Sequence, residues 1–198
     1  MLICYDSSSV VVDSLCKQAI ERNAVVACFY FDFAAQDQSP VAVLGSVLKQ
    51  IVGGLGEVPE RIVKAFRDRG KVIGGKRLEL SEIVELLQDI SSSRCTFLCI
   101  DALDECRPEY RLKLLDLLNN ILQRSPCARL FMTGRPHILG EVDKNLAMRA
   151  ATKSITPTKN DIVLFLRAKL REDTMPDAMD ESLEEEIIQN IPETVAEL

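Results

Sequence analysis

The stretch Thr96–Glu105 (TFLCIDALDE) decides the fold of this chain. Residues 95–100, which include the preceding Cys95, form an uncharged and mostly apolar run. Three carboxylates follow it: Asp101, Asp104 and Glu105. A short run of this kind predicts a buried strand of a parallel sheet that helices cover on both faces. In open parallel sheets, ligands bind just beyond the carboxyl ends of the strands. The stretch therefore predicts an α/β fold and the edge of the sheet at which a site would lie.

Outside this stretch, strand-like runs alternate with longer helical ones, as expected for an α/β domain with a three-layer parallel sheet. Val25–Phe31 (VVACFYF) and Ala128–Thr133 (ARLFMT) are predicted as two more strands, and Ala150–Ile155 as a weaker fourth. Ser39 followed by Pro40 is typical of a helix start, with serine as N-cap and proline in the first turn. The predicted helices of this part are Val10–Ala24, Ser39–Val52, Val58–Arg69, Ser81–Ile90 and Pro108–Gln123.

The composition changes after residue 156, where we place the start of a small helical lobe. Thr158 and Asp161 resemble a capping box with aspartate in the glutamate position, which predicts the first turn of a helix. The acidic segment from Glu181 onward is also predicted to be helical. We therefore expect a sheet-containing core over residues 1–156 and the beginning of a helical lobe over residues 157–198.

The composition excludes several classes of protein. The chain has 198 residues, of which 47% are hydrophobic and 27% charged, and its net charge is −6. This balance argues against a general binder of nucleic acids or of anionic membranes. No apolar run reaches the roughly 18 residues of a membrane-spanning helix, and Met1–Tyr5 lacks the basic start of a signal peptide. We expect no nucleic-acid partner, no membrane partner and a cytoplasmic location.

The seven cysteines do not predict a metal site, because no Cys-x-x-Cys occurs and His137 is the only histidine. An odd number of thiols within apolar stretches suits a reducing compartment. A redox role for Cys95 and Cys99 is one interpretation, and packing as small apolar side chains is the more common one.

Asp101 stands where a magnesium ion could be held, because hard cations prefer oxygen ligands and the end of a buried strand faces the ligand-binding edge. A second carboxylate, Asp104 or Glu105, could orient or deprotonate an attacking water. The alternative is structural: Asp101 closes the strand, while Asp104 and Glu105 begin a solvated helix. The spacing of these residues leaves both interpretations open.

Polar residues also follow the next predicted strand, in the sequence Thr133-Gly134-Arg135-Pro136. If the two strands are neighbours, the Thr133 hydroxyl and the Arg135 guanidinium lie beside Asp101. Both groups could then sense the γ-phosphate of a nucleotide. The alternative for Arg135 is an ordinary surface arginine in a turn before proline.

Four segments, in order along the chain, resemble one family of NTPases. Phe97–Cys106 (FLCIDALDEC) resembles the Walker B segment of NACHT-type NTPases of the STAND class, and Leu130–Pro136 (LFMTGRP) is similar to their sensor strand. Val25–Phe33 (VVACFYFDF) resembles the strand after the P-loop helix in the fungal and nephrocystin-like branch. Asp161–Leu166 looks like the helix that opens the family's helical lid.

The resemblance implies an ATP- or GTP-dependent switch that oligomerises in signalling, often with ankyrin or other repeats further along the chain. By this resemblance Asp101 would hold Mg²⁺, while Asp104 and Glu105 would position or activate water. Thr133 and Arg135 would contact the γ-phosphate. The implied partners are a nucleoside triphosphate and either further copies of the chain or a repeat domain.

The sequence departs from this family at its first element, a strand leading into G-x-x-x-x-G-K-[ST], since no glycine precedes Gly45. Leu2–Cys4 is the one stretch that could be a remnant of that strand, with Asp6–Ser9 in the place of the loop. The lysine is missing, and residues other than glycine resist the positive-φ turns of such a loop. Gly70–Lys76 matches G-x-x-x-x-G-K but follows a helix and continues into Arg77, so a basic loop is favoured.

These departures lead us to expect a fragment of a NACHT-type signalling NTPase, shortened at both ends, that does not hydrolyse nucleotide by itself. The main alternative is a non-catalytic protein-interaction scaffold that keeps the NTPase fold. A third possibility is a receiver-like domain in which Asp101 accepts phosphate, with Thr133 and Lys153 on the following strands.

Overall fold

The computed structural model describes residues 4–32, 38–70, 78–146, 151–171 and 181–196. The chain divides into two compact units, Met1–Ala150 and Ala151–Leu198. The strands of the first unit are β1 (Val25–Tyr30), β2 (Thr96–Asp101) and β3 (Ala128–Met132). Its helices are α1 (Cys4–Arg22), α2 (Pro40–Gly53), α3 (Glu60–Gly70), α4 (Leu80–Ser93), α5 (Pro108–Arg124) and α6 (Leu139–Asn145), with the 3-10 turns η1 (Leu103–Glu105) and η2 (Pro136–Ile138).

The three strands form one parallel sheet in the order β1-β2-β3. The register places Ala27 beside Leu98 and Leu98 beside Leu130, so these three side chains share one face. This arrangement confirms the α/β class and the parallel sheet that the apolar runs predicted.

The predicted fourth strand, Ala150–Ile155, is wrong for the part that the structure describes, because residues 151–158 have no regular structure. Ile155 is 69% exposed, so the segment has no buried face against which a strand could pack. Lys153 lies in the same exposed segment and not on a strand. The receiver-like arrangement therefore loses its third component. Ala150 lies outside the described residues.

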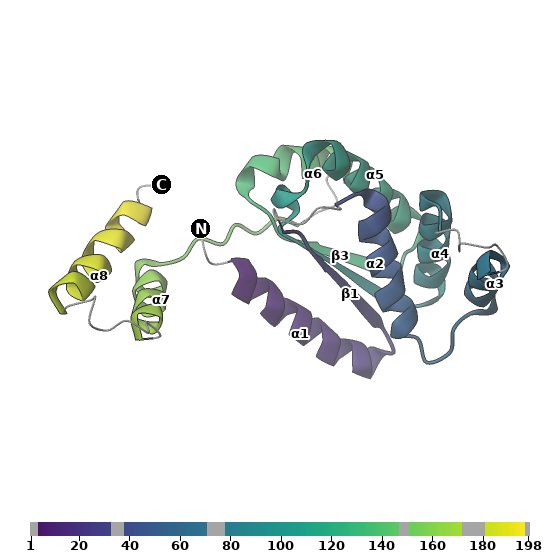
Figure 1. The fold of residues 1–198 in the computed structure, drawn as a ribbon, viewed down its shortest axis with the longest axis horizontal. Coiled ribbons are helices and arrows are strands. Elements are labelled where there is room, and N and C mark those ends of the chain that lie inside the picture. Colours follow the sequence, from purple (N-terminus) through teal and green to yellow (C-terminus); the bar gives the residue numbers. More distant parts are fainter. Residues whose placement is uncertain (1–3, 33–37, 71–77, 147–150, 172–180, 197–198) are drawn as a thin grey trace. The chain divides into compact units, whose positions relative to one another are not determined.

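The hydrophobic core lies on the face of the sheet that α2 and α5 cover, with α4 packed against these two helices, while α1 lies on the other side (Figure 1). Val25 and Ala27 of β1 and Phe31, the residue after it, belong to this core. Helix α2 starts as predicted, since the Ser39 hydroxyl accepts a hydrogen bond from the Ala42 N–H at 3.4 Å. Its buried side chains recur at helical spacing: Val43, Leu44, Val47, Leu48 and Ile51.

Helix α1 begins at Cys4, earlier than the predicted start at Val10. Asp6–Ser9 therefore forms helical backbone, and the prediction that it replaces a phosphate-binding loop is wrong. Aspartate and serine are poor residues in a helix interior, but they are well suited to a first turn. Cys4 is helical, so it is not part of a remnant strand, while Leu2 and Ile3 lie outside the described residues.

The matching stretch Gly70–Lys76 and the following Arg77 also fall almost wholly outside the described residues. Gly70 itself is the last residue of α3. The expected basic loop therefore stays a prediction.

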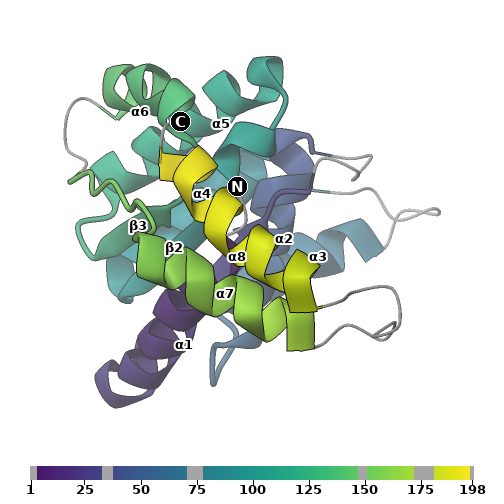
Figure 2. The same cartoon turned by 90° about the vertical axis from the view of Figure 1, so that its left-hand side faces the viewer.

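The second unit consists of α7 (Lys159–Arg171) and α8 (Glu181–Ala196), which pack side by side (Figure 2). The predicted capping box is present. The Thr158 N–H donates to Asp161 Oδ2 at 2.9 Å, and the Asp161 N–H donates to Thr158 Oγ1 at 3.2 Å. None of the helices in the described ranges combines the length and apolar character needed to cross a membrane.

Candidate functional site at the carboxyl edge of the sheet

Asp101 and Thr133 meet where β2 and β3 end. Asp101 is the last residue of β2 and is only 4% exposed, and the Thr133 hydroxyl donates a hydrogen bond to its Oδ1. The same hydroxyl accepts a hydrogen bond from the Ala102 N–H at 3.0 Å. The Thr133 backbone N–H donates to the Ile100 carbonyl at 3.0 Å, and its carbonyl accepts from the Leu103 N–H at 3.0 Å. The sequence correctly predicted that these two side chains are neighbours.

Ala102 turns the chain sharply after Asp101, with φ 52° and ψ 45° in the left-handed region. An L-residue with a β-carbon pays roughly 1 kcal/mol for this conformation, and such residues collect at functional sites. The turn ends β2 and starts η1, which contains Asp104 and the half-buried Glu105. Neither carboxylate begins the following helix, because α5 starts only at Pro108.

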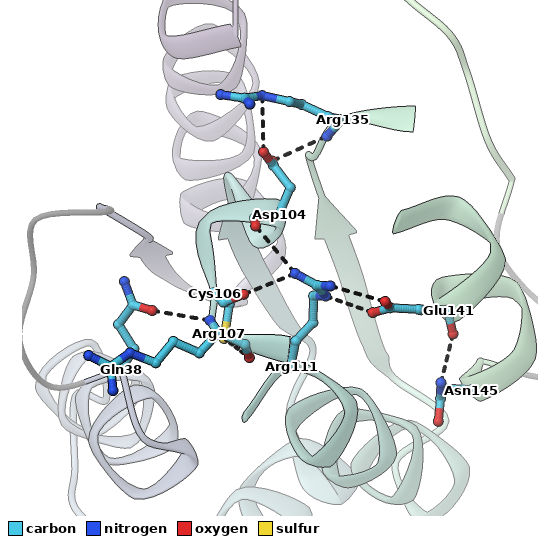
Figure 3. Close-up of polar contacts among 8 residues, drawn as sticks. All are labelled: Gln38, Asp104, Cys106, Arg107, Arg111, Arg135, Glu141 and Asn145. Carbon is cyan, nitrogen blue, oxygen red and sulfur yellow. Dashed lines mark hydrogen bonds and ion pairs between the residues drawn. The ribbon is translucent and has the colours of Figure 1, made fainter. Parts of the chain in front are cut away.

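Asp104 is held by Arg135 on the turn after β3 (Figure 3). Asp104 Oδ1 accepts the Arg135 backbone N–H at 3.2 Å, and its Oδ2 lies 3.2 Å from Arg135 Nε. The Asp104 side chain is 7% exposed and that of Arg135 is 46% exposed. A β-carbon at Gly134 would lie 2.7 Å from Ile138 Cδ1 but 3.5 Å from Asp104 Oδ1, which is an ordinary contact, so the tight approach at this glycine is to Ile138. The carboxylate predicted to activate water and the arginine predicted to sense phosphate are thus paired with each other.

Arg111, on α5, anchors the same loop from the protein interior (Figure 3). Its Nε and Nη2 donate to both carboxylate oxygens of Glu141, at 2.7 and 3.0 Å. Its Nη1 donates to the carbonyls of Asp104 at 3.2 Å and Cys106 at 2.9 Å. The hydrogen bond with Glu141 raises the pKa of Arg111, and the same contact lowers the pKa of the Glu141 carboxyl. The side chain of Arg111 is only 6% exposed.

Arg111 was not among the predicted site residues, although the sequence carries a signal for it. Leu114, Leu115 and Leu118 follow it at three, four and seven positions, so Arg111 lies on the buried face of α5. An arginine on such a face requires a partner. The partner, Glu141, lies on a helix predicted by no pattern.

Gln38 makes two hydrogen bonds next to this loop. This buried side chain donates from Nε2 to the Asp32 carbonyl at 2.8 Å and accepts the Arg107 N–H at 3.3 Å, so it joins the segment after β1 to the segment after η1. Burial raises the pKa of the Cys106 thiol to about 11, so this cysteine stays protonated at neutral pH. Cys106 is therefore a packing residue and not a nucleophile.

The oxygen donors at this edge suit a magnesium ion that takes its other ligands from water and phosphate. Within the described ranges, no group of three or more His, Cys, Asp and Glu side chains is placed to hold a metal by itself. Magnesium, however, is commonly held by one or two carboxylates, with waters and substrate phosphates as its other ligands. Asp101 offers such a carboxylate, and Thr133 offers the hydroxyl that orients it. The residues present therefore fit magnesium that arrives with a phosphate.

The fold and this edge together define an α/β domain whose acidic residues follow the middle strand of a parallel sheet. The sequence profile of the family described as Nephrocystin 3, N-terminal, matches residues 7–135, more than half of the chain. The chain belongs to this family. The matched range extends from α1 through Arg135 and agrees with the nephrocystin-like branch that Val25–Phe33 suggested. A search of curated proteins finds no match.

Proposed function

We propose that this chain supplies the magnesium-binding half of a site for ATP or GTP in a NACHT-type signalling NTPase that switches by oligomerising. The observation that carries the proposal is the buried Asp101 carboxylate at the end of β2, oriented by the hydroxyl of Thr133. When bound, the magnesium ion would neutralise phosphate charge, and Asp101 would hold it directly or through water. A parallel sheet presents ligands at this edge, which supports the assignment.

We further propose that the chain does not hydrolyse nucleotide by itself. Asp104 would have to accept a proton or orient water, but its carboxylate is held by the backbone and side chain of Arg135. Arg135 uses its backbone N–H and its Nε for this pair, so its Nη groups could contact a γ-phosphate while Asp104 stays held. Glu105 is the other carboxylate of η1 and is the second candidate for positioning water. Hydrolysis through Asp104 would require a rearrangement that the nucleotide or a neighbouring copy drives.

The test is a titration of the full chain with a fluorescent ATP or GTP analogue, with and without magnesium. We expect saturable, magnesium-dependent binding with a Kd of about 1 mM or tighter, and loss of the magnesium-dependent part in Asp101→Asn. Asp116→Asn is the matched control, because Asp116 is an exposed carboxylate on α5. An absence of saturation at millimolar nucleotide would remove the proposal for this chain.

A second candidate function is a non-catalytic interaction scaffold. The contacts of Asp104 with Arg135 and of Arg111 with Glu141 favour it, because they use polar groups of the site to hold the loop. In that case Asp101→Asn would change the free energy of unfolding without changing any nucleotide affinity. Denaturation and nucleotide titration of Asp101→Asn and Asp116→Asn therefore distinguish the two functions.

A further inference from the structure

Cys28 and Cys99 form a pair of thiols across the sheet, on the face opposite the hydrophobic core. They are register partners in the neighbouring strands β1 and β2. Ala27 and Leu98 face the core, so the next residue on each strand faces the other side. Neighbouring strands lie about 4.8 Å apart, which falls within the Cα separation of about 4.4 to 6.8 Å that a disulfide bridges. The register therefore gives the two cysteines a Cα separation compatible with a disulfide.

The two thiols differ in their surroundings. Cys28 is half-buried, whereas Cys99 is 3% exposed. Hydrogen bonding with Cys99 lowers the pKa of the Cys28 thiol most, burial raises it, and hydrogen bonding with Tyr30 lowers it further. Tyr30 is 45% exposed, so this end of the pair lies close to solvent. Cys28 is the more exposed of the two and is therefore the thiol that a small oxidant would reach first, while Cys99 is its register partner on the next strand.

We propose that Cys28 and Cys99 are an oxidisable dithiol, which a hydroperoxide converts to a cross-strand disulfide. The Cys28 thiolate attacks one oxygen of hydrogen peroxide, the O–O bond breaks, and hydroxide leaves as Cys28 becomes a sulfenic acid. Cys99 gives its proton to hydroxide and attacks the Cys28 sulfur, so that the S–O bond breaks and a second hydroxide leaves. In total the two thiols lose two protons and two electrons, and one peroxide becomes two waters.

A second pair of cysteines provides the comparison. Cys95 and Cys127 immediately precede β2 and β3, and the Cys95 thiol donates to the Cys127 carbonyl at 3.4 Å. These two cysteines are also neighbours and are more exposed than Cys99. The described contact of this second pair is with a backbone carbonyl and not with a second sulfur. If exposure alone decided oxidation, this second pair would react first.

The test uses the full chain, reduced and then treated with hydrogen peroxide, blocked with N-ethylmaleimide and digested without reductant. We expect two of the seven thiols to be lost, together with a peptide linking Cys28 to Cys99 that dithiothreitol separates. In Cys99→Ala, dimedone should trap a sulfenic acid on Cys28, whereas Cys28→Ala should lose both products. The double variant Cys95→Ala/Cys127→Ala should oxidise like the natural chain.

The peptide map of the oxidised natural chain tests the proposal even if a variant at the buried Cys99 does not fold. A link between Cys95 and Cys127, or retention of all thiols at tenfold peroxide, would overturn it. This inference is independent of nucleotide binding, because neither readout involves the carboxylates at the edge of the sheet.

Discussion

Replacing Arg111 with methionine keeps much of the apolar stem but removes the guanidinium that joins α5 to α6 and to the loop after β2. Glu141 would lose both of its donors, and the carbonyls of Asp104 and Cys106 would each lose one. Breaking a fully buried ion pair costs about 3 to 5 kcal/mol. The Glu141 side chain is 34% exposed, so water replaces part of the loss, and we expect about 3 kcal/mol. For a chain of this size that lowers Tm by about 6 to 12 °C.

Urea unfolding followed by far-UV circular dichroism measures this change, and hydrogen exchange of residues 103–107 reports on the loop itself. Lys113→Met is the control, because Lys113 is exposed on the same helix. In a double-mutant cycle with Glu141→Gln we expect a coupling energy of about 1 to 3 kcal/mol. The reasoning is refuted if Arg111→Met unfolds within about 0.5 kcal/mol of the natural chain, the range expected of an ordinary surface change.

Three further changes test other contacts. The pKa of Glu141 lies below its ordinary value of 4.5. Its ion pair with Arg111 therefore stabilises the fold fully above about pH 4.5, and this contribution is lost as the pH falls through the lowered pKa. In urea titrations the Glu141→Gln variant should lose less stability over that pH range than the natural chain. Thr133→Val removes the donor to Asp101 and should cost about 1 to 3 kcal/mol by the same assay, with no loss if the hydroxyl is dispensable. Gly134→Ala would press on the buried Ile138 and should lower Tm, at a cost of about 1 to 3 kcal/mol, whereas an unchanged Tm would show that this side chain moves freely.

Much of the fold was predictable because its main signals are local. The three strands are continuous apolar runs that only a buried parallel sheet accommodates, and the structure confirms each of them. Two helix starts were predictable for the same reason. The Ser39 and Asp161 side chains accept hydrogen bonds from backbone N–H groups only three residues away, at Ala42 and Thr158. The failures concern Cys4, Asp6–Ser9 and residues 151–155, where local propensity is weak and the outcome depends on burial.

The candidate site was predictable only in part. Asp101 and Thr133 each end a strand, so the pairing of those strands brings them together. The pairing of Asp104 with Arg135 depends on the left-handed turn at Ala102, which starts η1. No sequence spacing encodes that geometry, because the contact joins two loops that are distant along the chain.

Electron paramagnetic resonance of manganese, used in place of magnesium, tests most directly whether Asp101 holds the ion that accompanies a nucleotide. The full chain would be mixed with Mn²⁺ and a non-hydrolysable ATP or GTP analogue, and protein-bound manganese would be compared between the natural chain and Asp101→Asn. Asp116→Asn is again the control. We predict bound manganese that requires both the nucleotide and Asp101. Equal amounts of bound manganese in Asp101→Asn and the natural chain, or none in either, would contradict the proposed site.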